Sequence, residues 1–186
     1  MERTLDHLVV AARDLEEGSR WIHERLGARP VPGGQHALMG THNALLSLGP
    51  RLFLEVIAID PAAPPPARPR WFSLDTPAMR RLLEAGPALI HRVDRVADIE
   101  AALAGYPQSV EVLDLSRGQY RWRIGVPRDG HLPCNGRCAT LIQWRGPHPA
   151  EALPASGCSL AALERDGDAV LHTPRGERML PWRIPE

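Results

Sequence analysis

The apolar residues of this chain fall into short runs separated by turn-forming residues, a pattern that predicts several strands and few helices. Residues 8–12 form one such run and predict a buried strand with His7 near its start. A helix over residues 14–27 follows, because Asp14 is a good N-cap and apolar positions recur on one helical face. The chain therefore begins with a strand, a tight connection and a helix.

Three further strands complete this first unit. Residues 28–34 are rich in turn formers and leave room for a short edge strand. Residues 41–49 and 51–59 are longer apolar runs, and Glu55 lies in the middle of the second. Residues 1–60 thus predict a β-α-β-β-β module. The proline-rich residues 61–70 predict a semi-rigid linker.

The same order recurs in residues 71–146. His91 lies seven residues before Asp98, as His7 lies seven residues before Asp14. The two histidines are 84 residues apart, a distance that suits a duplicated module. We expect both modules to share one core.

The last strand of each module supports the duplication. Gln143 takes the place of Glu55 on this interpretation, after a four-residue insertion. The predicted fold is α+β, with two βαβββ modules forming one cupped mixed sheet and helices on the outside. Residues 147–186 predict an extension containing a β-hairpin that packs on the sheet, because 40 residues bury too little to fold alone. Residues 1–186 are treated as a single domain.

Composition excludes several classes of protein. The formal net charge is zero, with 22 basic and 22 acidic side chains, which argues against general binding to nucleic acid or anionic membranes. No apolar run approaches the length of a membrane span, and the N-terminus lacks a signal-peptide layout. The three cysteines do not suggest a secreted disulfide framework, so a cytoplasmic location is the default expectation. We expect Cys134 and Cys138 to be structural thiols, in preference to zinc ligands.

The paired modules, with a histidine on each first strand and Glu55 on a last strand, resemble the vicinal oxygen chelate superfamily. Within it, the chain looks like the bacterial glyoxalase-like domain proteins. The resemblance rests on segments spread over nearly the whole chain, which are Leu5-Asp6-His7, Met39-Gly40-Thr41-His42-Asn43-Ala44-Leu45, Leu54-Glu55, Arg68-Pro69-Arg70-Trp71-Phe72, Leu141-Ile142-Gln143-Trp144 and His148-Pro149. The superfamily uses one scaffold for isomerisation, ring cleavage, thiol addition and binding, so the resemblance implies a fold more than a reaction.

The resemblance also implies a metal held where the first and last strands of both modules meet. Carried over by position, the ligands are His7, Glu55, His91 and Gln143. Two imidazoles and one carboxylate suit Zn, Fe, Ni or Mn, and Gln143 adds a neutral oxygen. Glu55 is the catalytic candidate, since a carboxylate within an apolar strand must face a polar site or be desolvated at a large cost. The alternative for Glu55 is an ion pair with an arginine.

Other residues could contact a substrate in the cup. His42 and Asn43 open a strand and could orient it, or could serve a turn. Trp71 and Trp144 could line the cup, or pack in the core. Arg123 belongs to a group of four arginines around one hairpin that could meet an anionic substrate, or face solvent, and this group comprises Arg117, Arg121, Arg123 and Arg128. We assign no role to His23 and His36.

The leading function is a metal-dependent lyase, isomerase or dioxygenase acting on a small oxygenated metabolite. One alternative is a non-catalytic small-molecule-binding protein of the same fold that has lost the metal, which the neutral Gln143 favours. Another is a metal-free hydrolase or transferase that uses histidines as acid and base. Superfamily members often build cups across a dimer. Because both modules lie on this chain, one chain can complete a cup, and a homodimer stays open as an alternative.

Overall fold

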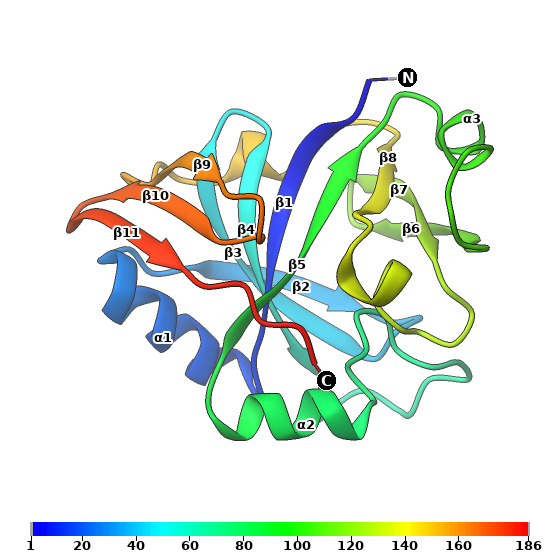
Figure 1. Ribbon diagram of the computed structural model, residues 1–186, viewed down its shortest axis with the longest axis horizontal. Coiled ribbons are helices and arrows are strands. Elements are labelled where there is room, and N and C mark those ends of the chain that lie inside the picture. The colour runs from blue at the N-terminus through cyan, green and yellow to red at the C-terminus, as the bar shows by residue number, and fades with distance from the viewer. Residues whose placement is uncertain (1, 186) are drawn as a thin grey trace.

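The computed structural model describes residues 2–185 and has an α+β fold built on one curled, mixed sheet of eight strands (Figure 1). The strand order is β2-β3-β4-β1-β5-β8-β7-β6. The strands are β1 (Thr4–Ala11), β2 (Val31–His36), β3 (Thr41–Gly49), β4 (Leu52–Ile59), β5 (Ala88–Arg95), β6 (Glu111–Arg117), β7 (Tyr120–Val126) and β8 (Thr140–Trp144). The first strands of the two modules, β1 and β5, lie side by side in the middle of Figure 1.

Strand pairing repeats between the two halves of the sheet. β1 pairs in parallel with β4, β5 pairs in parallel with β8, and β1 and β5 pair antiparallel to each other. β2 and β6 form the two edges. The predicted pair of βαβββ modules in one cupped sheet is therefore confirmed, and the uncertain edge strand near residue 34 is β2.

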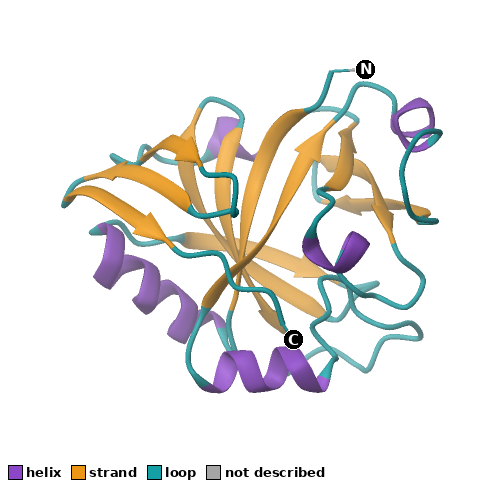
Figure 2. Ribbon diagram, viewed as in Figure 1, coloured by secondary structure: helices purple, strands orange, loops and turns teal. Residues whose placement is uncertain are grey.

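The helices lie at the periphery of the sheet (Figure 2). They are α1 (Leu15–Leu26), α2 (Pro77–Glu84) and α3 (Ile99–Leu103), with short 3-10 helices at Pro133–Gly136 and Pro149–Ala152. Asp14 caps α1 through its side chain and Gly27 ends it in the left-handed conformation, as the sequence predicted. Asp98 caps α3 in the same way.

The two faces of the sheet carry separate apolar cores. The concave face buries Val9 and Ile57 beneath Trp71, Phe72 and α2. The convex face of the first module is covered by α1 and by the C-terminal extension, with Leu8 and Val56 among its buried residues. Because successive residues of a strand face opposite sides, alternate positions of β1 and β4 belong to different cores.

The C-terminal extension forms its own three-stranded sheet in place of the predicted hairpin. Its strands are β9 (Ser159–Leu163), β10 (Ala169–Thr173) and β11 (Gly176–Leu180), in the order β11-β10-β9. A hairpin has two strands, so the sequence did not predict the third, which lies after the turn at Arg175-Gly176. β11 follows directly from that turn and pairs with β10 along its whole length.

Two of the three cysteines are bonded to each other, which corrects the expectation of free thiols. Cys134 and Cys138 form a disulfide in the loop before β8, while Cys158 is free and buried. The spacing of four residues allows this bond because the chain turns through a 3-10 helix between them. None of the helices within residues 2–185 combines the length and apolar character needed to cross a membrane.

Candidate active site

A pocket opens on the concave face of the sheet, where the two modules meet. Its cavity volume, counted as the space open to the centre of a water-sized sphere, is about 40 Å³. Five aromatic side chains form most of its wall, namely Phe53, Trp71, Phe72, Trp122 and Trp144. Its polar lining is limited to five residues, which are His7, His36, Asn43, Glu55 and Arg117. An apolar pocket with a few converging polar groups is the usual form of a small-molecule site.

A buried carboxylate fixes the orientation of His7. Asp6 is fully buried and its Oδ1 lies 2.7 Å from His7 Nδ1. Asp6 Oδ2 accepts hydrogen bonds from His148 Nε2 at 3.0 Å and from Trp144 Nε1 at 3.0 Å. Burial raises the pKa of the Asp6 carboxyl, but hydrogen bonds from His148 and His7 lower it by more, so its pKa falls below its ordinary value. Asp6 is therefore ionised, and His7 presents its other nitrogen, Nε2, to the pocket.

Glu55 faces His7 across the pocket floor. Glu55 Oε1 accepts a 2.6 Å hydrogen bond from Asn43 Nδ2, and Glu55 Oε2 lies 3.5 Å from His7 Nε2. Both side chains are almost completely buried. The register explains the meeting, because β1 and β4 pair in parallel with His7 opposite Phe53 and Val9 opposite Glu55.

His7 Nε2 and Glu55 Oε2 face each other across this distance. With Nδ1 of His7 donating to Asp6, a proton between Nε2 and Oε2 lets one of the two atoms donate to the other and avoids placing a lone pair against a carboxylate. This arrangement can accept or release a proton at a buried position, which is what general acid–base catalysis needs.

His36 and Arg117 form the other polar side of the pocket. Burial lowers the pKa of His36 to about 3, with smaller contributions from the positive charge of Arg117 and from His7 and His42, so His36 is neutral at pH 7. Arg117 Nη1 lies 3.4 Å from His36 Nε2 and 3.2 Å from Asn43 Oδ1. Asn43 thus binds Glu55 with its amide nitrogen and Arg117 with its amide oxygen.

The family model for the glyoxalase-like domain matches residues 5–174, which is most of the chain. This chain belongs to the glyoxalase-like domain family. The resemblance drawn from the sequence is thereby confirmed. No curated protein matches the chain at a significant level.

Two solved structures are similar to this chain. A hypothetical protein from Staphylococcus aureus matches with a TM-score of 0.55 and 14% identity over 96% of this chain and 84% of that one. At this identity the likeness shows the fold alone. Methylmalonyl-CoA epimerase from Mycobacterium tuberculosis matches with a TM-score of 0.48 and 21% identity, covering 81% of this chain and 92% of the epimerase.

Several residues predicted for the site of this glyoxalase-like protein do line the pocket. His7, Glu55, Asn43, Trp71 and Trp144 all do so. His42 is adjacent to Asn43 on β3 and therefore faces the other way, with its Nδ1 4.0 Å from Asp60 Oδ1. The pocket contains Asn43 and not His42 because only one of two neighbouring strand residues can face it.

Gln143 and Arg123 lie outside the pocket for the same reason. They pair with each other between β7 and β8, whereas their neighbours Trp122 and Trp144 face the pocket. Gln143 donates to the carbonyl of Ala97 and accepts from the N–H of Ile99, so it holds the start of α3. Arg123 forms ion pairs with two exposed carboxylates, those of Glu100 and Asp114.

The register also corrects the predicted counterpart of Glu55. Val9, two residues after His7, pairs with Glu55, and the equivalent Val93, two residues after His91, pairs with Thr140. Thr140, and not Gln143, is therefore the equivalent of Glu55 in the second module. The predicted counterpart lies three residues too far along the last strand, and the offset between the modules at this strand requires an insertion of one residue in place of four.

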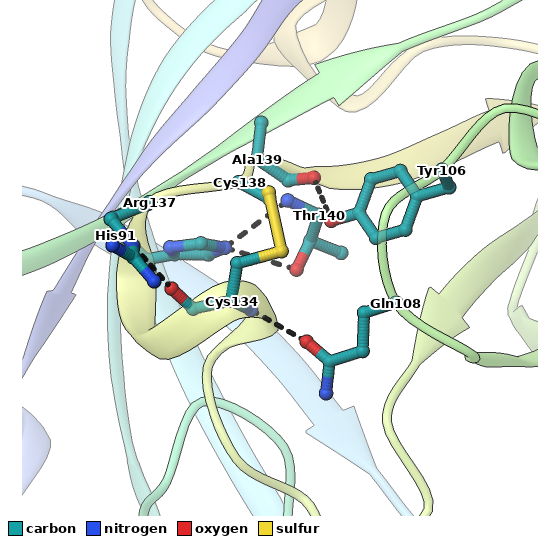
Figure 3. The surroundings of a disulfide bond; sticks show 8 residues. All are labelled: His91, Tyr106, Gln108, Cys134, Arg137, Cys138, Ala139 and Thr140. Carbon is teal, nitrogen blue, oxygen red and sulfur yellow. Dashed lines mark hydrogen bonds between the residues drawn. A yellow bond between two sulfur atoms is a disulfide. The ribbon is translucent and has the colours of Figure 1, made fainter.

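His91 makes different contacts from those of His7. Its Nε2 accepts a 3.1 Å hydrogen bond from the N–H of Thr140 and lies 3.0 Å from Thr140 Oγ1. Figure 3 shows His91 pointing toward Thr140, in the segment that follows the Cys134–Cys138 disulfide. His91 is completely buried and does not line the pocket.

The donor set does not fit the predicted metal site. Within residues 2–185, three or more His, Cys, Asp or Glu side chains nowhere gather in a way that could hold a metal ion. Only His7 and Glu55 converge, and catalytic zinc normally has three protein ligands. Non-haem iron oxygenases need two histidines and one carboxylate, and here one of each converges. We therefore derive no step through a metal.

Three residues of the pocket were missed or passed over in the sequence. Asp6 was seen only as part of a family segment, although a carboxylate next to a strand histidine can orient it. His36 was assigned no role, and the structure places it at the end of β2. Arg117 was noted among four arginines, and nothing in its local sequence distinguished it from Arg123.

The burial of His91 predicts a loss of stability in acid. Burial, with smaller contributions from His7 and Arg92, lowers the pKa of His91 to about 3. The unfolded chain, with the ordinary pKa near 6.5, binds the proton more readily. Stability is therefore complete above about pH 6.5 and falls as the pH decreases toward 3. His91→Gln keeps an acceptor for Thr140 and should reduce the loss between pH 7 and pH 4 by about 3 kcal/mol.

Urea unfolding at pH 7 and at pH 4 measures this effect. His131→Gln is the matched control, since His131 is exposed and its substitution should leave the pH dependence unchanged. The same pH dependence in the wild type and in His91→Gln would show that His91 does not contribute to acid unfolding.

Proposed function

We propose that this glyoxalase-like protein is a lyase or isomerase that moves a proton on a small oxygenated metabolite, with Glu55 as the general base. The observation that carries the proposal is the approach of Glu55 Oε2 to His7 Nε2, 3.5 Å apart inside an aromatic pocket. A substrate entering the pocket would take the place of water around this pair. Glu55 would accept a proton from carbon next to a carbonyl, and His7 would supply or hold the second proton.

The supporting residues suit this chemistry. Asp6 keeps His7 in one tautomer and stabilises its protonated form, so that a proton can pass between Glu55 and His7 at little cost. Asn43 holds Glu55 with its remaining oxygen directed at His7. The aromatic wall excludes water, which strengthens each electrostatic interaction within the pocket.

Deuterium exchange tests this function without knowledge of the substrate. Pooled small oxo and hydroxy acids and aldehydes are incubated with the protein in D₂O and followed by proton NMR. We expect at least one compound to lose the signal of a proton next to its carbonyl. No exchange at high protein concentration, combined with binding of a pool member, would establish the non-catalytic binding protein instead.

The same experiment, repeated after a chelator has removed bound metal, tests the predicted Zn, Fe, Ni or Mn. Because two protein ligands converge and not three, we expect exchange to persist after dialysis against EDTA. Loss of exchange that is restored by one of these metals would show that His7 and Glu55 hold a metal whose other ligands are supplied by substrate or water.

The binding protein remains the second candidate because of one observation. Glu55 is already paired through both oxygens, with Asn43 at 2.6 Å and His7 at 3.5 Å, as a purely structural carboxylate would be. Either protein would take a small-molecule ligand in the same pocket.

A further inference from the structure

Arg117 reaches the pocket from the far edge of the sheet. It is the last residue of β6, and the edge strands β6 and β2 approach each other across the open side of the cup. Its side chain passes directly over Gly34 of β2, where an added Cβ would lie 2.6 Å from Arg117 Cδ. Its guanidinium then contacts His36 and Asn43 within the pocket lining.

Arg117 forms no ion pair within the described residues, although the more distant Glu55 carboxylate raises its pKa in part. Its two pocket contacts are neutral, an amide oxygen and an imidazole whose pKa of about 3 keeps it uncharged. Among residues 2–185, no carboxylate forms an ion pair with Arg117. Burial lowers the pKa of Arg117, yet an arginine remains protonated at pH 7. The guanidinium of Arg117 therefore lies in the pocket lining without a carboxylate at ion-pair distance among the described residues.

A second donor in the wall also has no partner. Trp71 is 3% exposed and lines the pocket, and its indole N–H has no hydrogen-bond acceptor within the described chain. A buried donor without an acceptor destabilises the protein unless a ligand or water supplies one. A ligand group with acceptor oxygens would satisfy this N–H.

We propose that Arg117 binds the carboxylate of the substrate, so that the pocket takes a small monocarboxylic acid. The guanidinium presents several N–H groups in one plane, and a carboxylate accepts two of them side by side. The aromatic wall would contact the rest of the ligand. This inference rests on the proposed function only in assigning the ligand as substrate, because the binding itself does not require Glu55 to react.

Asn43 links Glu55 to Arg117 and so fixes how far apart these two side chains lie. Its amide contacts Glu55 with one atom and Arg117 with the other, so the acid–base pair and the carboxylate-binding group are separated by a single amide. If the ligand's carboxylate binds Arg117, the carbon atoms next to that carboxylate would lie beside Glu55. The substrate class is thus an acid whose reacting carbon is near its carboxylate.

Matched neutral analogues test the proposal directly. Lactate is compared with lactamide, and benzoate with benzamide, by calorimetry and by thermal shift at pH 7. We expect at least one carboxylate to bind the wild type in the millimolar range or tighter, and its amide to bind at least tenfold more weakly. Arg117→Gln should weaken carboxylate binding about 10- to 100-fold. Arg121→Gln, at an exposed arginine on β7, should leave it unchanged.

Two further variants separate this proposal from the catalytic one. Glu55→Gln should still bind the carboxylate even if it abolishes exchange, so failure of catalysis and failure of anion binding give different results. Arg117→Lys, which keeps the charge, should bind the carboxylate with intermediate affinity. It also provides a test if Arg117→Gln does not fold. Equal binding of acid and amide, no binding of either carboxylate, or unchanged binding in a folded Arg117→Gln would each overturn the proposal.

Discussion

Glu55→Gln is expected to lower the rate of proton exchange by about 10²- to 10⁴-fold. The substitution keeps the size of the side chain and an oxygen that can accept from Asn43. It removes the group that accepts the proton, because an amide is not basic near pH 7. The neutral amide would also leave His7 Nε2 without the carboxylate that now lies 3.5 Å away.

The measurement is the deuterium exchange rate of the same pooled compounds, per mole of folded protein. Glu164→Gln makes the same chemical change at an exposed position outside the pocket and should retain the wild-type rate. If Glu55→Gln exchanges as fast as the wild type, Glu55 is not the base and the proposed mechanism fails. Carboxylate binding by calorimetry shows that the pocket of the variant is intact.

Asp6→Asn should decrease the free energy of unfolding by about 3 to 5 kcal/mol. Asp6 is fully buried and accepts from His7, His148 and Trp144. Asparagine has the same shape, but one oxygen becomes an N–H₂ that faces a donor. At least one of the three partners is then left unsatisfied, and the negative charge that faces His7 and Arg95 is lost.

Chemical denaturation at pH 7 measures this loss. Asp129→Asn is the control, because Asp129 is exposed and its backbone contact to His131 can be kept by an amide. The dependence of the free energy of unfolding on pH below 4 gives a second measurement. The pKa of Asp6 is lowered in the folded state, so its contribution is present above the ordinary pKa near 4 and is lost as the pH falls below that value. Asp6→Asn should flatten this part of the curve, and wild-type stability in the variant would contradict the role assigned to Asp6.

Much of the fold could be predicted because strands and turns leave local signals. The run of residues 51–59 and the recurrence of His7 at His91 depend on hydrophobicity and spacing, which are properties of the chain itself. β11 was missed because its residues are mostly exposed, with a burial pattern that carries no apolar alternation. Its pairing with β10 is what makes it a strand.

Site residues were harder to predict because their position depends on register. A shift of one residue along a strand reverses the face, and this placed Gln143 and Arg123 outside the cup while Trp144 entered it. Arg117 lines the pocket because the sheet curls until its two edge strands, β2 and β6, approach each other. These strands are far apart in the sequence, so no local sequence pattern predicts the approach.

The disulfide illustrates a similar limit. Two cysteines four residues apart can be thiols, metal ligands or a disulfide, and only the path of the backbone decides among them. Here the 3-10 turn brings the two Cα atoms to 5.5 Å, a normal disulfide separation.

The paired glycines of β2 have a consequence for comparing related sequences. A Cβ at Gly33 would collide with the side chain of Asn43, and one at Gly34 would collide with Arg117. Any side chain at these positions would fill the space through which both polar groups reach the pocket. Glycine at 33 and 34 should therefore change in step with Asn43 and Arg117 during divergence. A relative that has gained bulk at position 34 should have exchanged Arg117 for a smaller residue and should select uncharged ligands.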